Sequence, residues 1–521
     1  MLSGNVLVPL YVFAASPEPM ILAQANMNQP SPIILPDMGD SSSADLSNID
    51  EKQLGEKIMR EIRRDPDYSR DYVLYDYYNQ VGKELASNAR KQKISGSDLS
   101  GPLAPKFEFF GIRERSINAF ALPGGYVGIH SGLVLAAQTE SELASVLGHE
   151  IGHITQRHIA RSMDQGGTNT FIMLASLLLA GLAVRNNPGA AQGFAIGGQA
   201  LAINNQLSYS RGAEREADRV GFQILQATGF DVNAMADFFQ RLQKATGIMD
   251  SGVPAYVRTH PLTIERIADM QDRARNILNQ KRIPSSLEFY LAQSRAKLEQ
   301  QGKFSELLET RQYFDAQVQA GIPVKKMQGY YGLALLSLKE NKVDDAENYL
   351  KKSREIAQTL SQGGSPIIKS GIAFEVTTSE IALLRKKYDQ AINSAQQGLR
   401  LNFSSKAAGV ALVEAELASG KVSDAIAWLK QKTKTQSDDA DYWDLLARAY
   451  AKQNRATLYH AALAEKYAID GGLLSAIEQL KIALKENDGD FYQMSEIDAR
   501  LRQLQSQYRE QLKDEGKSIR E

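Results

Sequence analysis

The sequence predicts a mainly helical α+β fold, in which a domain with a small sheet is followed by an all-α array of repeated helix pairs. Three observations support this prediction. Short strand patterns occur near residues 107–129, and helical spacing of apolar residues dominates the flanking segments. After residue 283, a pattern of two helices joined by a short turn recurs. A chain of 521 residues is also too long for one ordinary core. We therefore expect two folded domains, residues 50–282 and 283–521.

The composition is that of a globular protein and excludes several kinds of site. The chain is 43% hydrophobic and 23% charged, and its net charge of -1 favours neither nucleic acid nor an anionic membrane as the main partner. It has no cysteine, which excludes disulfides, cysteine nucleophiles and cysteine metal ligands. Nitrogen and oxygen atoms must therefore hold any metal.

The N-terminal segment has most features of an export signal. Residues 5–15 form an apolar stretch of signal-peptide length, and residues 23–25 form a small-x-small cleavage pattern. No Lys or Arg precedes Lys52, however, so the usual positive start is missing. We interpret residues 1–25 as an atypical signal peptide, with a disordered apolar tail as the alternative. Residues 26–49, rich in Pro and Ser, are expected to be a flexible leader.

The first folded domain begins with a helix and a short sheet. Residues 72–85 carry apolar side chains at helical spacing, whereas residues 107–112, 119–122 and 126–129 have strand patterns. A Pro-Gly-Gly turn at residues 123–125 joins the last two strands.

The next helix carries the most informative motif. Thr139 followed by Glu142 is the pattern of a capped helix start. The apolar residues after it fall on one stripe: Leu143, Val146, Leu147, Ile151 and Ile154. The helix also contains HEIGH at residues 149–153, a match to H-E-x-x-H.

This motif has the spacing of a zinc peptidase site. His149 and His153 are four residues apart, so both imidazoles project from one helix face, as two ligands of a tetrahedral zinc require. Glu150 lies about 100° round the helix. There it can act as general base toward a water whose pKa zinc lowers to about 7. The alternative is a chance match on a solvent-exposed helix. The capped start and the glycines at 148 and 152, which allow close packing, favour the metal site.

A third ligand must come from elsewhere. The extended motif H-E-x-x-H-x-x-G-x-x-H is absent, because Gln156 and Ile159 occupy its last two defined positions. His158 lies about half a turn from the ligand face, so we expect a structural role for it.

The best source is an acidic helix start at residues 208–219. Glu214 and Asp218 share one helix face, so one can bind zinc while the other hydrogen-bonds a ligand imidazole. Glu216 projects from another face and is expected to be a surface charge. The alternative is that all three acids form a solvated face.

These motifs together resemble a known family. HEIGH, Glu214-x-x-Ala217-Asp218, the segment from Asn118 to Ala121 and Gly124-Gly125 are similar to gluzincin metallopeptidases related to CAAX prenyl proteases and HtpX heat-shock proteases. The resemblance implies one zinc per chain. Its ligands would be His149, His153 and Glu214, with Glu150 as base and Asp218 in the second shell. It further implies that Asn118, Ala119, Phe120, Ala121 and Leu122 form an edge strand to which an extended substrate adds; an ordinary hairpin strand is the alternative.

A further histidine lies near the end of this domain. His260, in Thr259-His260-Pro261 before Arg266-Ile267, would ordinarily be a surface or capping residue. The pattern resembles a segment recurring in periplasmic members of the family. This implies His260 as a candidate fourth ligand that displaces the catalytic water and keeps the enzyme latent.

Relatives of this kind are often membrane proteins, so we ask whether the apolar residues 171–184 could span a bilayer. Fourteen apolar residues span about 21 Å as a helix, short of the hydrocarbon core of about 30 Å. We therefore predict no transmembrane span. With residues 190–203, this segment is expected either to lie over the active site or to pack in the core.

The second domain consists of repeated helix pairs. A short turn followed by hydrophobic-x-x-Ala recurs, with small residues at 346, 391 and 425, and the last interval of 34 residues matches the tetratricopeptide period. Weaker copies start at residues 302 and 471. Such repeats stack into a superhelix that binds peptides or partner domains. Trp428 and Trp443 are expected in its core, and residues 492–521 are expected to form a capping helix.

The combination of export signal, gluzincin domain and repeats resembles periplasmic proteases of Gram-negative bacteria that act on outer-membrane β-barrel proteins. This implies a periplasmic location, with peripheral contact to the outer membrane as an open alternative. The implied partners are unfolded or misassembled outer-membrane proteins and, through the repeats, the barrel assembly machinery. Three hypotheses stay open: an active zinc endopeptidase, a chaperone or scaffold with a largely latent protease site, and a metal-free interaction protein.

Overall fold

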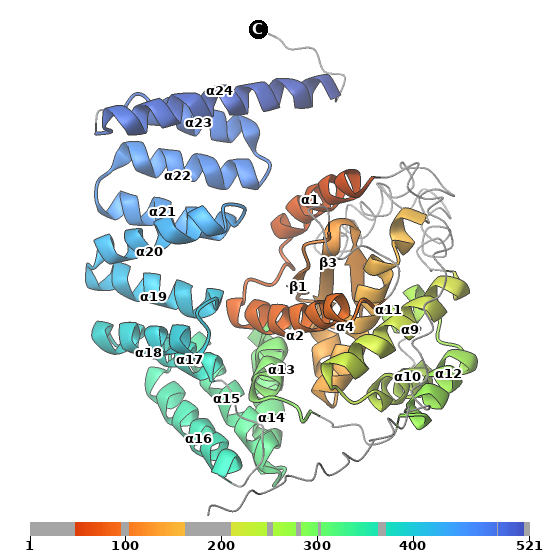
Figure 1. Cartoon of the computed structure of the whole chain (residues 1–521). Coiled ribbons are helices and arrows are strands. Elements are labelled where there is room, and N and C mark those ends of the chain that lie inside the picture. The colour runs from red at the N-terminus through yellow and green to blue at the C-terminus, as the bar shows by residue number, and fades with distance from the viewer. Residues whose placement is uncertain are drawn as a thin grey trace, which may run out of the picture. The chain divides into compact units, whose positions relative to one another are not determined.

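The structure is a computed structural model of the chain. It describes residues 47–94, 104–161, 210–246, 254–277, 283–300, 304–362, 371–486 and 488–514. Helices predominate among these residues and accompany one three-stranded sheet, so the predicted mainly helical α+β class is confirmed (Figure 1). The predicted signal peptide, most of the leader and the apolar segments 171–184 and 190–203 lie outside the described residues. Within the described residues, no helix combines the length and apolar character needed to cross a membrane.

The sheet has its central strand last in sequence. Strands β1 (Glu108–Ile112) and β2 (Ala119–Leu122) flank β3 (Tyr126–His130), which runs parallel to β1 and antiparallel to β2. A 3₁₀ turn at Pro123–Gly125 joins β2 to β3, and Gly124 and Gly125 have φ of 81° and 100° there, values that favour glycine. Among the described residues, β2 is therefore an edge strand, the position that the family resemblance implies.

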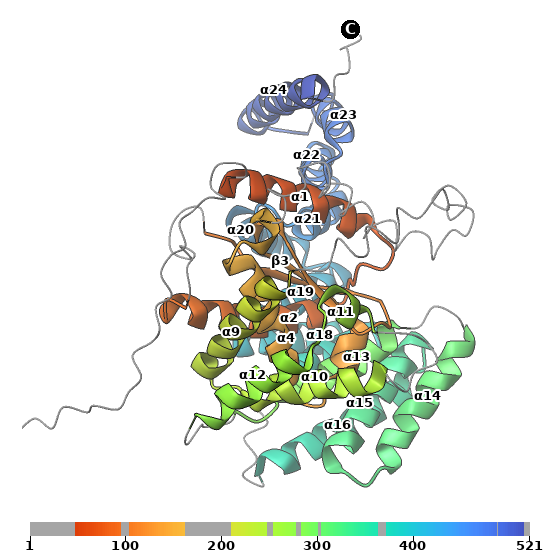
Figure 2. The same ribbon diagram turned by 90° about the vertical axis from the view of Figure 1, so that its right-hand side faces the viewer.

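Eight helices accompany this sheet in the described part of the first domain. They are α1 (Asn48–Arg64), α2 (Tyr72–Lys91), α3 (Ser131–Ala136), α4 (Glu140–Thr155), α9 (Arg211–Thr228), α10 (Asn233–Thr246), α11 (Ala255–Thr259) and α12 (Ile264–Arg275). Helix α4 carries the HEIGH motif and lies among α2, α9 and α10 (Figure 2). Most of its predicted stripe is buried. Leu143, Val146, Leu147 and Ile151 are fully enclosed in the main core, and Ile154 is half-buried against it.

Helix α4 starts where the sequence predicts, with a modified cap. The Thr139 hydroxyl accepts a hydrogen bond from the Glu142 backbone N–H. The Glu142 carboxylate, however, accepts from the N–H of Gln138 at 2.6 Å and pairs with Arg241. The cap therefore fixes both the first turn of α4 and the chain entering it.

Glycines bring α4 and α9 into close contact. A Cβ atom at Gly152 would lie 2.9 Å from the Ala217 carbonyl oxygen, and one at Gly221 would lie 2.9 Å from the backbone nitrogen of His149. Larger residues would push the helices apart at these positions. The predicted role of the motif glycines in close packing is thus confirmed at Gly152, and the crossing brings the acidic face of α9 to the histidine face of α4.

The second domain is entirely helical in its described residues. Its helices are α13 (Leu287–Glu299), α14 (Phe304–Gln319), α15 (Pro323–Lys339), α16 (Val343–Gln362), α17 (Ile372–Leu384), α18 (Tyr388–Leu401), α19 (Lys406–Ser419), α20 (Val422–Thr435), α21 (Ala440–Lys452), α22 (Ala456–Ile469), α23 (Leu473–Ala483) and α24 (Phe491–Asp514). From α14 on, consecutive helices mostly pack against each other (Figure 1). The repeat alanines 346, 391 and 425 are fully buried. Trp428 and Trp443 pack against the core of α19 to α22, as expected.

Helix α2 joins the two domains. Asp71, which caps α2, forms an ion pair with the buried Arg295 of α13 at 2.8 Å. In the second turn of α2, the Asp76 carboxylate accepts hydrogen bonds from the backbone N–H groups of Lys406 and Ala407 at the start of α19. On its other side, α2 packs against α4 and α9. One helix therefore contacts both the motif helices and the repeats.

Candidate metal centre

Four side chains from three parts of the chain meet in the core. His149 and His153 from α4, Glu214 from α9 and His260 after α11 are each 0–2% exposed, and one nitrogen or oxygen from each lies within 4.8 Å of all the others. The His149 and His153 Nε2 atoms are 3.0 Å apart. The Glu214 Oε1 atom lies 3.4 Å from His153 Nε2 and 3.0 Å from His260 Nδ1. The structure therefore brings the three predicted ligands together and adds the candidate fourth.

These distances fit a tetrahedral metal site. Ligands at about 2.0–2.1 Å from a tetrahedral zinc are separated from one another by roughly 3.3–3.5 Å. His149 Nε2 lies 3.3 Å from His260 Nδ1 and 3.5 Å from the second Glu214 oxygen, Oε2, whereas the separations of 3.0 Å given above are slightly shorter than this range. Three imidazoles and one carboxylate, with no sulfur donor, also match the ligands that zinc accepts in proteins.

Asp218 supports the cluster from behind. It lies one turn after Glu214 on α9 and is fully buried, with Oδ1 3.0 Å from His149 Nδ1. This contact orients the imidazole so that Nε2 faces the other three donors. Burial alone would raise the pKa of the Asp218 carboxyl, but hydrogen bonds from Arg266 and His149 hold it below its usual value. Of the two carboxylates that the sequence leaves open, Glu214 is thus the one among the donors and Asp218 the one behind them.

Glu150 is buried beside the cluster without a completed hydrogen bond. Its Oε1 lies 3.5 Å from His260 Nε2, and the Ala121 amide of β2 is close, yet neither carboxylate oxygen makes a hydrogen bond of normal geometry. Burial raises the pKa of this carboxyl, although His260 and His149 oppose the shift. A buried carboxyl with a raised pKa and unpaired oxygens is typical of a group kept for proton transfer.

His260 is held by the end of α11. Its backbone N–H donates to the Tyr256 carbonyl at 2.8 Å, and its ring stacks on the Tyr256 ring with centroids 4.7 Å apart. Tyr256 is itself fully buried, and its hydroxyl has no hydrogen-bond partner among the described residues. The alternative of a surface position for His260 does not hold, because the ring is buried among the other donors.

The edge strand lies beside this cluster. Strand β2 packs against α4, and its backbone approaches Glu150 at Ala121. The predicted segment is partly accessible: Phe120 and Ala121 are of intermediate exposure, while Asn118, Ala119 and Leu122 are buried. Among the described residues, the free edge of β2 therefore lies next to the candidate base.

His158 and Glu216 form a layer behind His153. The His158 and His153 Nδ1 atoms lie 2.9 Å apart, and the other His158 ring nitrogen lies 3.0 Å from the Glu216 carboxylate, which also accepts from Arg161. The structural role predicted for His158 agrees with this geometry. Glu216, expected to be a surface charge, is 28% exposed and is in addition paired with His158 and Arg161. Its partners lie 55 and 58 residues away in sequence.

Two residues near the centre have no role in the sequence-based prediction. Tyr256 and Arg266 are both buried against the cluster. A sequence signal existed for Arg266, because it shares a helix face with the buried residues Met270 and Ala274 at four-residue intervals. A charged residue on an apolar face needs a buried partner.

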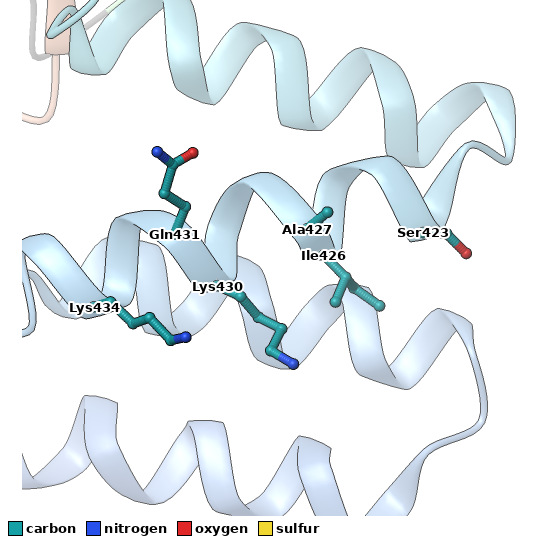
Figure 3. Close-up of a pocket in the computed structure, with 6 residues that line it drawn as sticks. All are labelled: Ser423, Ile426, Ala427, Lys430, Gln431 and Lys434. Carbon is teal, nitrogen blue, oxygen red and sulfur yellow. The ribbon is translucent and has the colours of Figure 1, made fainter.

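A separate surface pocket lies in the repeat domain. It measures about 490 Å³ and is lined by one face of α20: Ser423, Ile426, Ala427, Lys430, Gln431 and Lys434 (Figure 3). None of its lining residues belongs to the metal centre, so it has no part in the chemistry described above.

Comparisons with known proteins match both domains. The model of Peptidase family M48 matches residues 81–274, and the Tetratricopeptide repeat model matches residues 382–449. The Beta-barrel assembly-enhancing protease of Escherichia coli O157:H7 is 33% identical over 481 residues, which cover 91% of this chain and 92% of that protein. The chain belongs to the beta-barrel assembly-enhancing protease family.

Other relatives agree with this family assignment. The member from Yersinia pestis is 32% identical over 475 residues, with 91% of this chain and 92% of that protein covered. The Mitochondrial metalloendopeptidase OMA1 of Arabidopsis thaliana is 26% identical over 224 residues, 43% of this chain and 41% of that protein. The predictions of a gluzincin metallopeptidase with C-terminal tetratricopeptide repeats, and of a metalloendopeptidase activity, are confirmed.

Proposed function

We propose that this protein is a zinc endopeptidase of the cell envelope that cleaves unfolded or stalled polypeptides, in particular outer-membrane β-barrel proteins. The observation that carries the proposal is the buried set of His149, His153, Glu214 and Glu150, in which donor atoms and base are close together. We assign one zinc per chain to His149, His153 and Glu214. The choice of zinc rests on donor chemistry and ligand spacing.

In this mechanism each residue has a separate role. Zinc at the site supplies Lewis-acid polarisation of the peptide carbonyl and lowers the pKa of water. Glu150 takes a proton from the attacking water as the C–O bond forms, and it then delivers that proton to the leaving amine nitrogen as the C–N bond breaks. Asp218 keeps the His149 ring in its ligating orientation through Nδ1. The buried surroundings strengthen these interactions by excluding bulk solvent.

The edge strand is proposed to align the substrate. An unfolded polypeptide can add to β2 through backbone hydrogen bonds, with little dependence on its side chains. The approach of Ala121 to Glu150 supports this placement, because a strand paired with residues 118–122 runs past the base. Folded proteins cannot present such an extended segment, which favours unfolded clients.

His260 is proposed as a reversible fourth ligand. Its Nδ1 lies 3.0 Å from Glu214 Oε1 and 3.3 Å from His149 Nε2, in the same range as the other donor separations. A fourth protein ligand takes the position that catalysis needs for water. Activity would then require the segment after α11 to move, so His260→Ala is expected to raise basal proteolysis.

The repeats are proposed to contact the barrel assembly machinery in the periplasm, either free or peripheral to the outer membrane. Tetratricopeptide repeats bind proteins, and the names of the full-length relatives refer to β-barrel assembly. The alternative function is a chaperone or scaffold whose protease site stays largely latent; the position of His260 among the ligands favours it.

The deciding experiment compares the purified protein with Glu150→Gln. Both are incubated with an unfolded β-barrel protein, and zinc content is measured on the same samples. We expect about one zinc per chain in both, and a loss of cleavage of about 10²–10⁴-fold in the variant. Zinc in both with cleavage in neither favours the scaffold, and cleavage would then be sought with His260→Ala. Absence of zinc from both would contradict the proposed function.

A further inference from the structure

Arg266 makes an unusual set of contacts at the metal centre. It lies near the start of α12 and is only 3% exposed. Its Nε and Nη2 atoms donate to the two Asp218 carboxylate oxygens at 2.6 and 2.8 Å. The remaining nitrogen, Nη1, lies 2.8 Å from Glu214 Oε2 and donates to the Pro261 carbonyl at 2.8 Å. The guanidinium group therefore reaches Glu214 and Asp218 of α9 and the residue after His260.

The contact requires helix α12 to lie against α9, as it does in Figure 2. The guanidinium carbon also lies 5.2 Å from the centre of the Phe239 ring of α10, which packs beside it. Charges and ring together hold the Arg266 side chain in one orientation. A group this constrained can in turn constrain its partners.

We propose that Arg266 is the positioning residue of the metal centre, which sets the orientation of Glu214 and Asp218 and ties the His260 segment to them. This inference rests on the proposed function, because it gives Arg266 a role in the same zinc site. Asp218 passes the constraint to His149 through its contact with Nδ1. Two of the proposed zinc ligands, Glu214 and His149, thereby depend on one guanidinium group.

Charge and shape both explain why arginine occupies this position. Glu214 and Asp218 are buried on the same helix face, and without a cation between them the two carboxylates would repel each other in a medium of low dielectric constant. A planar guanidinium can bind both oxygens of Asp218 side by side and still reach Glu214 and Pro261. A lysine ammonium group supplies the charge without this geometry.

The contact with Pro261 connects the ligands to the His260 segment, which is proposed to keep the enzyme latent. Pro261 follows His260 directly, so the hydrogen bond from Arg266 holds the turn that carries the fourth ligand. Loss of the guanidinium is therefore expected to loosen the His260 segment and to disturb the carboxylates at once. Movement of that segment would, conversely, shift the Arg266 side chain and so change the orientation of Glu214.

The test measures metal binding in the absence of any substrate. The unaltered protein, Arg266→Gln, Arg266→Lys and Arg275→Gln are freed of metal and titrated with zinc against a chromophoric chelator. Arg275 is the matched control, since it lies on the same helix and pairs with Asp272 at the surface. Each protein is also loaded with cobalt(II), whose visible absorption reports the number and geometry of its ligands. Hydrogen exchange of residues 260–262 gives a third readout.

We expect Arg266→Gln to lose zinc affinity by about 10–100-fold. Its cobalt spectrum should change and residues 260–262 should exchange faster. Arg266→Lys should recover part of the affinity but not the spectrum, because it restores charge without the planar contacts. Arg275→Gln should match the unaltered protein in all three readouts.

Two results would overturn the inference, and they differ from each other. If the unaltered protein binds zinc and folded Arg266→Gln binds it within about threefold with the same cobalt spectrum, Arg266 has no positioning role. If the unaltered protein binds no zinc, the proposed function fails and the inference with it. If Arg266→Gln does not fold, the Arg266→Lys variant provides the test. A cobalt spectrum of Arg266→Lys identical to that of the unaltered protein would overturn the inference.

Discussion

The metal centre and the junction of α2 with the repeats both bury charged side chains, but they treat those charges differently. At the junction, Lys406 is 8% exposed and donates three hydrogen bonds of 2.7–2.9 Å to Asp439 and Asp441. The rings of Tyr72, Tyr75 and Tyr442 lie 5.0–5.5 Å from its ammonium group. At the metal centre, Glu150 is more deeply buried, yet its carboxylate completes no hydrogen bond of normal geometry.

The difference indicates what each region is selected to do. A buried charge whose hydrogen bonds are complete fixes one arrangement of the chain, as Lys406 does for α2, α19 and α21. A buried carboxylate left incomplete costs stability and is tolerated where chemistry needs it. Removing a buried charged side chain at the junction should therefore lower the stability of the protein. Removing the Glu150 charge should instead raise the stability of the metal-free protein. Four experiments test this contrast.

The largest effect is expected from Lys406→Ala. The substitution leaves Asp439 and Asp441 facing each other without their shared cation, which should lower the free energy of unfolding by about 3–5 kcal/mol. Urea denaturation measures the change. Lys421→Ala is the control, because Lys421 pairs with the exposed Asp389 and should have almost no effect. Equal effects of the two substitutions would show that the junction is not a special case.

A fall in pH should destabilise the protein, because protonation places a positive charge on the buried His130 side chain. Burial lowers the pKa of His130 in β3 to about 4, despite the nearby Glu114 and the hydrogen bond with Ser116. Between pH 6.5 and 4 the unfolded chain binds a proton that the folded chain does not. The contribution of His130 to stability is therefore complete above pH 6.5 and falls by about 3 kcal/mol as the pH drops to 4.

Denaturation of zinc-free protein across this pH range measures the His130 contribution. His130→Gln retains a hydrogen-bonding side chain for Ser116 but cannot titrate, so its stability should depend less steeply on pH. The difference in slope should approach one proton per chain at about pH 5. Parallel curves for the two proteins would contradict the shift in pKa.

Asp76→Ala should have an intermediate effect. The Asp76 carboxylate accepts hydrogen bonds from the Ser405 hydroxyl and from two backbone N–H groups at the start of α19, at 2.7–3.0 Å. Loss of these three hydrogen bonds should lower the free energy of unfolding by about 2 kcal/mol. It would also leave two backbone N–H groups at the start of α19 without their acceptor. Asp389→Ala, on the surface of α18, should leave the urea midpoint unchanged. A fall in stability no greater than that of Asp389→Ala would argue against α2 as the link between domains.

The smallest effect has the opposite sign. Burial raises the pKa of Glu150, so at neutral pH its ionised form weakens the metal-free fold relative to the unfolded chain. Glu150→Gln removes that charge with little change of shape and should stabilise metal-free protein by about 1 kcal/mol, even as it abolishes cleavage. Thermal denaturation after chelation is the measurement. A destabilised variant would mean that the carboxylate has structural partners.

Sequence reasoning located the local parts of the site and missed the connections between them. The pair His149 and His153, the cap at Thr139 and the strand at residues 119–122 are predictable, because each depends on spacing within a few residues. The choice between Glu214 and Asp218 was not, since both share one face of α9. Arg266 carried a visible signal, a charge on an apolar helix face, but its partners could not be named.

By itself, the sequence determined which helices and strands form, that two histidines share a face and that repeated helix pairs follow. Helical periodicity and capping act over short stretches, and any folded form of the chain must respect them. Only the tertiary structure decided that His260 meets His149 across 111 residues, and that Arg266 reaches Asp218 across 48. Such contacts depend on how α4, α9 and α12 pack together. The close approach of α4 to α9 depends on which helix meets Gly152 and Gly221, and helical periodicity does not specify that partner.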